Sequence, residues 1–183
     1  MPIPASESEL AALFARLGAS EPESWARSQV LEGIPQLLRY LFLKAAWRNV
    51  ASDDDTSWMR SEVDRANSRP EEPYAGLGLG LHQCLRQGVD PVVLNEMIRC
   101  AQATMIFRLG YLLDGAEPSG LEELCDVSWA LFQTDADGRP TGPAIGGLHE
   151  SVLELDPTGR EMRPPEALRT IASRNEAGNA APS

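Results

Sequence analysis

The strongest helical signal in the sequence is the stretch DPVVLNEMIRCAQATMIFRLGYLL, residues 90–113. Asp90 followed by Pro91 is typical of a helix start, because an aspartate can cap free backbone N–H groups and proline fits the first helical position. Gly115 lies shortly after the last apolar residue, as is typical of a helix end. We therefore predict one long helix that ends near Leu113.

This helix is apolar on nearly all sides, which predicts a place in the middle of a helical bundle. A thin polar stripe interrupts it, formed by Asn95, Arg99 and Gln102 at i, i+4 and i+7, with Glu96 placed for an ion pair with Arg99. Because buried polar groups need partners, the stripe indicates either an internal hydrogen-bond network or a surface that another molecule covers. The internal network is the simpler interpretation.

Shorter helices are predicted from capping residues and from apolar residues at helical spacing. They cover residues 6–18, 20–33, 35–50, 57–69, 77–88 and 121–125. Ser6 and Glu9 form a capping box for the first, and Ser20 is the expected cap of the second. The second and third are either two helices or one helix kinked at Pro35. In the third, the expected apolar face consists of Leu37, Leu38, Leu41, Phe42, Ala45 and Ala46, with Arg39 off this face.

Two segments have strand character. Residues 76–81 alternate between glycine and leucine, but their leucines also fit a helix, which we prefer. Residues 127–134 are rich in strand-forming residues, and Asp-Ala-Asp-Gly at 135–138 contains the Asp-Gly pair of a hairpin turn. A return strand near residues 143–148 completes the predicted hairpin.

These elements predict a mainly α fold, a single-domain helical bundle of about five to six helices with a small C-terminal β-hairpin, over residues 1–162. Residues 163–183 have few large apolar side chains and are predicted to be a disordered tail. The cysteines Cys84, Cys100 and Cys125 lie in apolar contexts without paired spacing, so we expect them to be reduced and buried.

The charge balance narrows the classes of partner. Acidic residues outnumber basic ones 27 to 16, giving a formal net charge of -11. This disfavours nucleic acids and anionic membranes as partners, and it suits either a basic protein or plain solubility. The N-terminus lacks a signal-peptide pattern, and charged residues interrupt the longest apolar stretches. We therefore expect a cytoplasmic protein, and the near absence of lysine is typical of GC-rich bacterial genomes.

No catalytic or cofactor motif is complete. The glycines at 76, 78 and 80 lack the spacing of a dinucleotide-binding loop. The acidic run at 135–138 fails as a calcium loop, because Gln133 and Ala144 would occupy its first and twelfth ligand positions. A serine-hydrolase motif is also absent from the sequence. We predict neither a metal nor a cofactor.

Two groups of residues are candidates for function. The candidate partner-binding residues are Asp53, Asp54, Asp55 and Trp58. An acidic loop beside a tryptophan suits a basic partner, since tryptophan is enriched at interface hot spots, although Trp58 could equally pack inward. The candidate polar-site residues are Asn95, Glu96, Arg99, Gln102, His149 and Glu150. Two glycines precede the His149-Glu150 pair and permit unusual backbone geometry there, with local capping or pairing as the simpler interpretation.

Two hypotheses for function follow. The first is a non-enzymatic protein-binding protein with an acidic, aromatic-containing face. By compositional analogy alone, its most concrete forms are an immunity-type protein that neutralises a toxin and an adaptor or chaperone for a secreted effector. The alternative is an enzyme or small-ligand-binding protein with a site around Glu96, Arg99 and His149, recognisable by a pocket in which these groups meet. A homodimer formed through the long helix is compatible with both.

Overall fold

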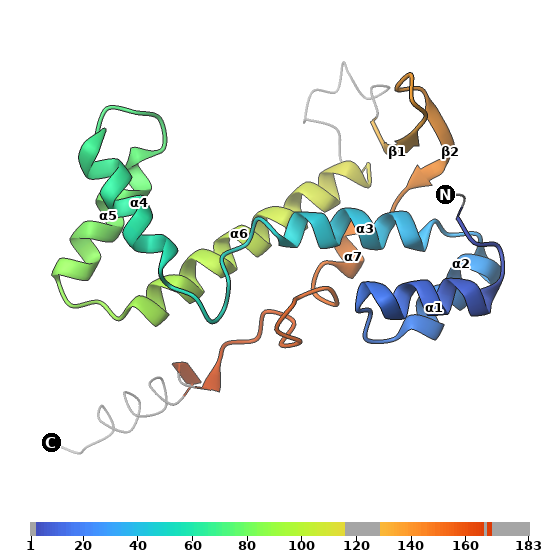
Figure 1. Ribbon diagram of the computed structural model, residues 1–183, viewed down its shortest axis with the longest axis horizontal. Helices are drawn as coiled ribbons and strands as arrows, with labels where there is room; N and C mark the ends of the chain where they lie inside the picture. The colour runs from blue at the N-terminus through green and yellow to red at the C-terminus, as the bar shows by residue number, and fades with distance from the viewer. Residues whose placement is uncertain (1–2, 116–128, 167, 170–183) are drawn as a thin grey trace, which may run out of the picture. The chain divides into compact units, whose positions relative to one another are not determined.

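The computed structural model describes residues 3–115, 129–166 and 168–169, and within these ranges the chain is mainly helical (Figure 1). The elements in chain order are α1 (Glu7–Leu17), α2 (Pro22–Glu32), α3 (Gln36–Trp47), α4 (Trp58–Ser68), α5 (Ala75–Arg86), α6 (Pro91–Leu113), β1 (Leu131–Thr134), β2 (Pro140–Ile145) and α7 (Leu148–Ser151). The two strands form one antiparallel sheet. The predicted mainly α fold with a small C-terminal hairpin is therefore confirmed.

The chain divides into two compact units, each described here by itself. The first unit comprises Met1–Asn49 and Thr104–Gly159, and the second comprises Val50–Ala103 and Arg160–Ser183. The prediction that residues 1–162 form one domain stays a prediction. Most of the predicted tail, and the predicted short helix at 121–125, lie outside the described residues.

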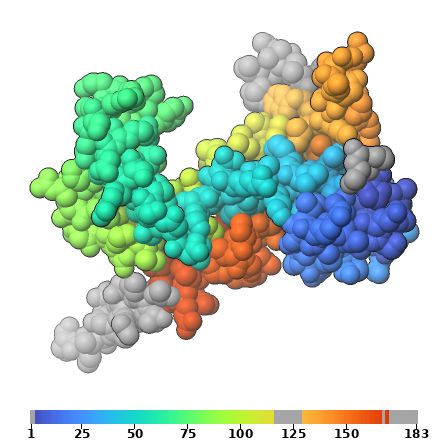
Figure 2. Space-filling model, in the orientation of Figure 1, coloured from blue at the N-terminus to red at the C-terminus, as the bar shows by residue number. Residues whose placement is uncertain are grey.

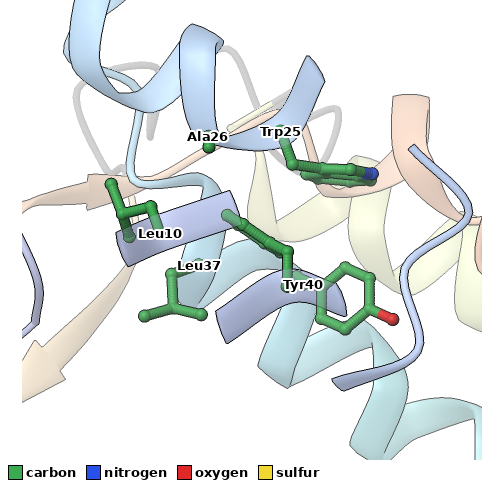
Figure 3. Packing of buried hydrophobic residues seen from close by; sticks show 6 residues of the cluster. Leu10, Trp25, Ala26, Leu37 and Tyr40 are labelled. Atoms are coloured by element: carbon green, nitrogen blue, oxygen red, sulfur yellow. The ribbon is translucent and has the colours of Figure 1, made fainter. Parts of the chain in front are cut away.

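The core of the first unit forms where α1, α2 and α3 meet (Figure 3). Its buried residues are Leu10, Phe14, Trp25, Ala26, Leu37 and Tyr40. Tyr40 presents its ring edge-on to Phe14 and Trp25, with centroid separations of 5.5 and 5.4 Å. Such edge-to-face contacts are favourable because the positive edge of one ring meets the negative face of the other. The aromatic side chains thus fix the three helices against one another.

Helix α1 has the predicted ends. The hydroxyl oxygen of Ser6 accepts a hydrogen bond from the backbone N–H of Glu9, and Gly18 closes the helix at φ 86°. The predicted cap of α2 is wrong. That helix begins at Pro22, which suits the first helical position, and its N-cap residue is Glu21, whose side chain makes no capping hydrogen bond. The segment around Pro35 forms two separate helices, α2 and α3, rather than one kinked helix.

The predicted apolar face of α3 is also wrong. Its buried residues are Gln36, Leu37, Arg39, Tyr40, Leu43 and Trp47. Leu41 and Ala45, expected inside, are exposed. Tyr40 and Trp47 determine this orientation, because each buries a large ring and satisfies its polar group. The Tyr40 hydroxyl donates to the carbonyl of Leu17, and the Trp47 indole N–H donates to the carbonyl of Val152.

Helix α6 runs over the predicted residues, and a carboxylate oxygen of Asp90 accepts the N–H of Val92 at 2.8 Å. The expectation that it is buried on nearly all sides is wrong. Its buried positions include the polar residues Asn95, Glu96 and Arg99, whereas Met97 is 64% exposed and Met105 is 54% exposed. Within the described residues, no helix is both long and apolar enough to cross a membrane.

Helices α4 and α5 of the second unit pack through a glycine. A Cβ atom at Gly78 would lie 2.2 Å from the carbonyl oxygen of Glu62 and 2.6 Å from the Cβ of Ala66. Only glycine permits this close approach. The alternating glycine-leucine segment, residues 76–81, lies within α5, so the preferred helix is confirmed. The neighbouring core of this unit consists of Met59, Leu81 and Leu94, with partly buried residues including Trp58, Val63 and Ile98 around them.

The hairpin differs from the prediction in its return strand, which begins at Pro140 rather than near residue 143 and ends at Ile145. One oxygen of the Asp135 carboxylate accepts N–H bonds from Asp137 and Arg139, so this side chain organises the loop. Gly138 there has φ 79°, which a glycine adopts without strain. The predicted start of the first strand, residues 127–128, lies outside the described residues.

The cysteines differ in part from the expectation. Cys84 and Cys100 are free thiols, but Cys84 is only half-buried and Cys100 is exposed. The expected burial is therefore wrong for Cys100, because its position on α6 lies between the buried stripe and the exposed apolar side. Cys125 lies outside the described residues.

Candidate functional site

The polar stripe of α6 binds the backbone of the acidic loop, which we define as residues 50–57. The backbone N–H of Ala51 donates to the side-chain oxygen of Gln102 at 2.8 Å, and the Arg99 guanidinium donates to the Ala51 carbonyl. The Asn95 side-chain amide donates to the carbonyl of Ser52 at 2.7 Å. The stripe therefore forms an internal hydrogen-bond network, the simpler of the two interpretations of its pattern.

Trp58 belongs to the same network. Its indole N–H donates to the side-chain oxygen of Asn95 at 2.9 Å, and its half-buried ring packs against the core of the second unit. Asn95 thus accepts from the first residue of α4 and donates to the loop that precedes this helix. A contact of Trp58 with a partner stays a prediction, since much of its ring and its N–H are used inside the unit.

Asp53 of the loop forms a cluster of four alternating charges with Arg99, Glu96 and Arg160. The Arg99 side chain is only 3% exposed and lies 3.7 Å from Asp53 and 3.8 Å from Glu96, measured from its Nε to a carboxylate oxygen of each. Arg160, from the segment after α7, also contacts Glu96, at 3.3 Å, and Asp53. Buried ions need such compensation, because removal from water is costly for each charge. No pattern in the sequence indicates Arg160, which lies 64 residues from Glu96.

Asp54 and Asp55 are exposed, as Asp53 is. Asp55 accepts the N–H of Ser57 at 2.8 Å, and Ser52 donates its hydroxyl to Asp54. The side-chain and then the backbone hydrogen bond of Ser57 lower the pKa of Asp55, so this carboxyl remains ionised near neutral pH. The loop forms part of the visible surface (Figure 2). It therefore presents two carboxylates from a backbone that α6 holds in place.

Cys100 is adjacent to this cluster. Its sulfur lies 4.0 Å from a carboxylate oxygen of Glu96. Burial, and next the negative charge of Glu96, raise the pKa of the Cys100 thiol, because both disfavour the thiolate. This thiol is therefore protonated at neutral pH and is a weak nucleophile there.

His149 and Glu150 belong to the first unit, where Asp114 binds the start of α7. The two carboxylate oxygens of Asp114 accept the N–H groups of Leu148 and His149, each at 3.0 Å, and the Nδ1 of His149 lies 2.5 Å from the same carboxylate. The rings of Phe107 and Tyr111 lie nearly perpendicular to the imidazole ring, with centroids 5.9 and 5.0 Å from it. His149 thus pairs with Asp114, 35 residues away in the sequence, and sequence reasoning missed this partner. A functional role for His149 and Glu150 stays a prediction.

Arg39 was also missed. It is buried, and one of its terminal nitrogens lies 3.5 Å from the Ser151 hydroxyl. Gly147 lies beside this guanidinium with φ 68°, a backbone conformation that glycine adopts without strain. Burial lowers the pKa of Arg39, against the opposing negative charges of Glu150, Asp114 and Glu154. Glu150 is exposed and acts on this guanidinium through its charge.

The residues grouped in the enzyme hypothesis fall into different units. Glu96 and Arg99 lie together in the second unit, and His149 lies in the first. Within the described ranges, no group of three or more His, Cys, Asp or Glu side chains could hold a metal ion. The strongest candidate site is therefore the acidic loop on its polar support.

Comparisons of this chain with protein-family models, with curated proteins and with solved structures found no match.

Proposed function

We propose that the protein is a non-enzymatic binding protein whose acidic loop, residues 50–57, docks a basic partner protein. The observation that carries this proposal is that buried polar side chains of α6 hold the loop backbone while Asp54 and Asp55 face solvent. A basic surface on the partner would meet carboxylates that are already in position.

The polar stripe supports this proposal because its buried residues bind the loop. An apolar residue at Asn95 or Arg99 would give the core more hydrophobic burial, yet these side chains bind the loop. A loop that is ordered before binding loses less conformational entropy when the partner arrives. The net charge of -11 further favours a basic partner, because long-range attraction speeds association.

The most concrete form of this proposal is an immunity-type protein that neutralises a basic toxin in the cytoplasm. An adaptor or chaperone for a secreted effector would use the same surface. In both, the chain acts by occupying a surface of its partner, and no chemical step is required of its own residues.

The test is a capture experiment with the tagged full chain and an extract of the cells that make it. The variant is Asp54→Asn with Asp55→Asn, because asparagine keeps a side-chain oxygen for the bonds from Ser52 and Ser57. Asp53 stays unchanged, since it contacts Arg99 and Arg160. The matched control, Asp135→Asn with Asp137→Asn, removes the same charge from the hairpin loop.

We expect one stoichiometric basic partner that the wild type and the control retain at low salt and that high salt releases. The Asp54 and Asp55 variant should retain several-fold less of it, because rim charges govern attraction and salt dependence. Equal retention by both variants would contradict docking at the acidic loop.

A further inference from the structure

The segment that follows α7, residues 160–163, is anchored on the acidic loop by one arginine. One terminal nitrogen of Arg160 lies 3.3 Å from Glu96 and donates at 2.6 Å to the carbonyl of Arg163, and the other contacts Asp53 and lies 3.4 Å from Glu96. The Arg160 side chain is 22% exposed. An arginine of the chain therefore already contacts both the Asp53 carboxylate of the loop and the Glu96 carboxylate of α6.

The backbone next to Arg160 is strained. Glu161 has φ 50° and Met162 has φ 58°, and both are residues with a Cβ in the left-handed region. This conformation is unfavourable for such residues and persists only where surrounding contacts hold it. Two consecutive residues of this kind indicate that the contacts of the segment, those of Arg160 among them, hold it against an opposing backbone preference.

The geometry also indicates which basic side chain fits between Asp53 and Glu96. The planar guanidinium of Arg160 uses both terminal nitrogens, so that one side chain bridges two carboxylates on different elements. A lysine has a single point charge and cannot form this fork. The pair Asp53 and Glu96 is therefore better suited to an arginine side chain than to a lysine.

We propose that Arg160 is a built-in arginine ligand that holds residues 160–163 closed over Asp53 and Glu96, and that an arginine of the partner protein replaces it and releases the segment. This rests on the proposed function and adds to it the chemistry of the partner's contact residue. Backbone strain destabilises the closed segment. An incoming arginine can therefore open it with a lower affinity than it would need if the closed segment were unstrained.

The first test is amide hydrogen exchange on the full chain. Arg160→Ala should raise the exchange rate of the backbone amides of residues 161–163 at least tenfold, whereas Arg163→Ala, which removes the same charge from an exposed side chain, should leave the rate within twofold of wild type. Adding a hexa-arginine peptide to the wild type should raise the same rate more than an equal amount of hexa-lysine. An unchanged rate in Arg160→Ala would overturn the proposal.

The second test is the affinity of a labelled hexa-arginine peptide. Arg160→Ala should bind it about tenfold more tightly than Arg163→Ala, because the internal competitor is gone. Glu161→Gly should bind it about threefold more weakly than Glu161→Ala, since glycine relieves the left-handed strain and stabilises the closed segment. The glutamate variants keep the test decisive if Arg160→Ala does not fold. Equal affinities within each pair would overturn the proposal.

These outcomes are separable from those of the proposed function. Failure of the proposed function would appear as capture that does not depend on Asp54 and Asp55. The exchange rates of the amides of residues 161–163 and the order of peptide affinities do not require either residue. They depend on Asp53 and Glu96, which the capture variants leave unchanged.

Discussion

Asp114 is the residue on which helix α7 depends, because its carboxylate accepts the N–H groups of Leu148 and His149. Asp114→Ala should lower the free energy of unfolding by about 2 kcal/mol, the upper range for the loss of a helix cap. Urea unfolding measures this change. Asp137→Ala, which removes an exposed carboxylate from the hairpin loop, should change stability by less than about 0.5 kcal/mol. Equal effects of the two substitutions would contradict the capping role.

A substitution of Arg99 tests whether the polar stripe stabilises the fold. Arg99→Met keeps much of the side-chain volume but leaves Glu96 and Asp53 without one of their cations and the Ala51 carbonyl without a donor. Breaking a buried ion pair typically costs about 3–5 kcal/mol, so the variant should be severely destabilised. Thermal or urea unfolding would show this directly. A fold as stable as wild type would mean that this arginine is not needed to hold the loop.

The pKa of Cys100 gives a prediction that depends on pH. Because burial and Glu96 raise that pKa, less thiolate is present at pH 8 than for a free cysteine. Alkylation of Cys100 by iodoacetamide, followed by mass spectrometry of its peptide, should therefore reach half its maximal rate above the ordinary value of 9.0. Glu96→Gln should move this midpoint to lower pH. A midpoint below 9.0 in the wild type would contradict the assigned surroundings.

At the scale of elements, the contact between α4 and α5 depends on Gly78. Gly78→Ala would place a methyl group against the backbone of α4, and we expect a loss of about 1–3 kcal/mol, as for overpacking. A Cβ at Gly76 would meet nothing within 4 Å, so Gly76→Ala should stabilise the protein by about 0.5–1 kcal/mol. Thermal unfolding of the two variants checks the opposite signs. The same sign for both would contradict this packing.

The ends of elements could be predicted where single residues determine them. Asp90, Pro91 and Gly18 act through local backbone geometry, so α6 and α1 have the predicted limits. The buried face of α3 could not be predicted by counting apolar residues. It depends on where the polar groups of Tyr40 and Trp47 find carbonyl partners, and for Trp47 the partner lies 105 residues away.

At the scale of the whole molecule, the sequence identified both halves of the candidate site but not their contact. Charge indicates the acidic loop, and helical spacing indicates the stripe. Their hydrogen bonds join residues more than 40 positions apart, at separations of 43 and 51 for Asn95 and Gln102. Helical spacing gives the direction of a side chain but does not specify its distant partner. Arg160 was not predicted for the same reason.

The most direct test of docking at the acidic loop removes a hydrogen bond that supports the loop without changing any charge. Gln102→Met removes the acceptor of the Ala51 N–H, so the amide of Ala51 should exchange faster with solvent. If a preordered loop matters for binding, the same variant should retain several-fold less of the basic partner than wild type in the capture experiment. Faster exchange at Ala51 with undiminished retention of the partner would contradict the claim that α6 holds the acidic loop ready for docking.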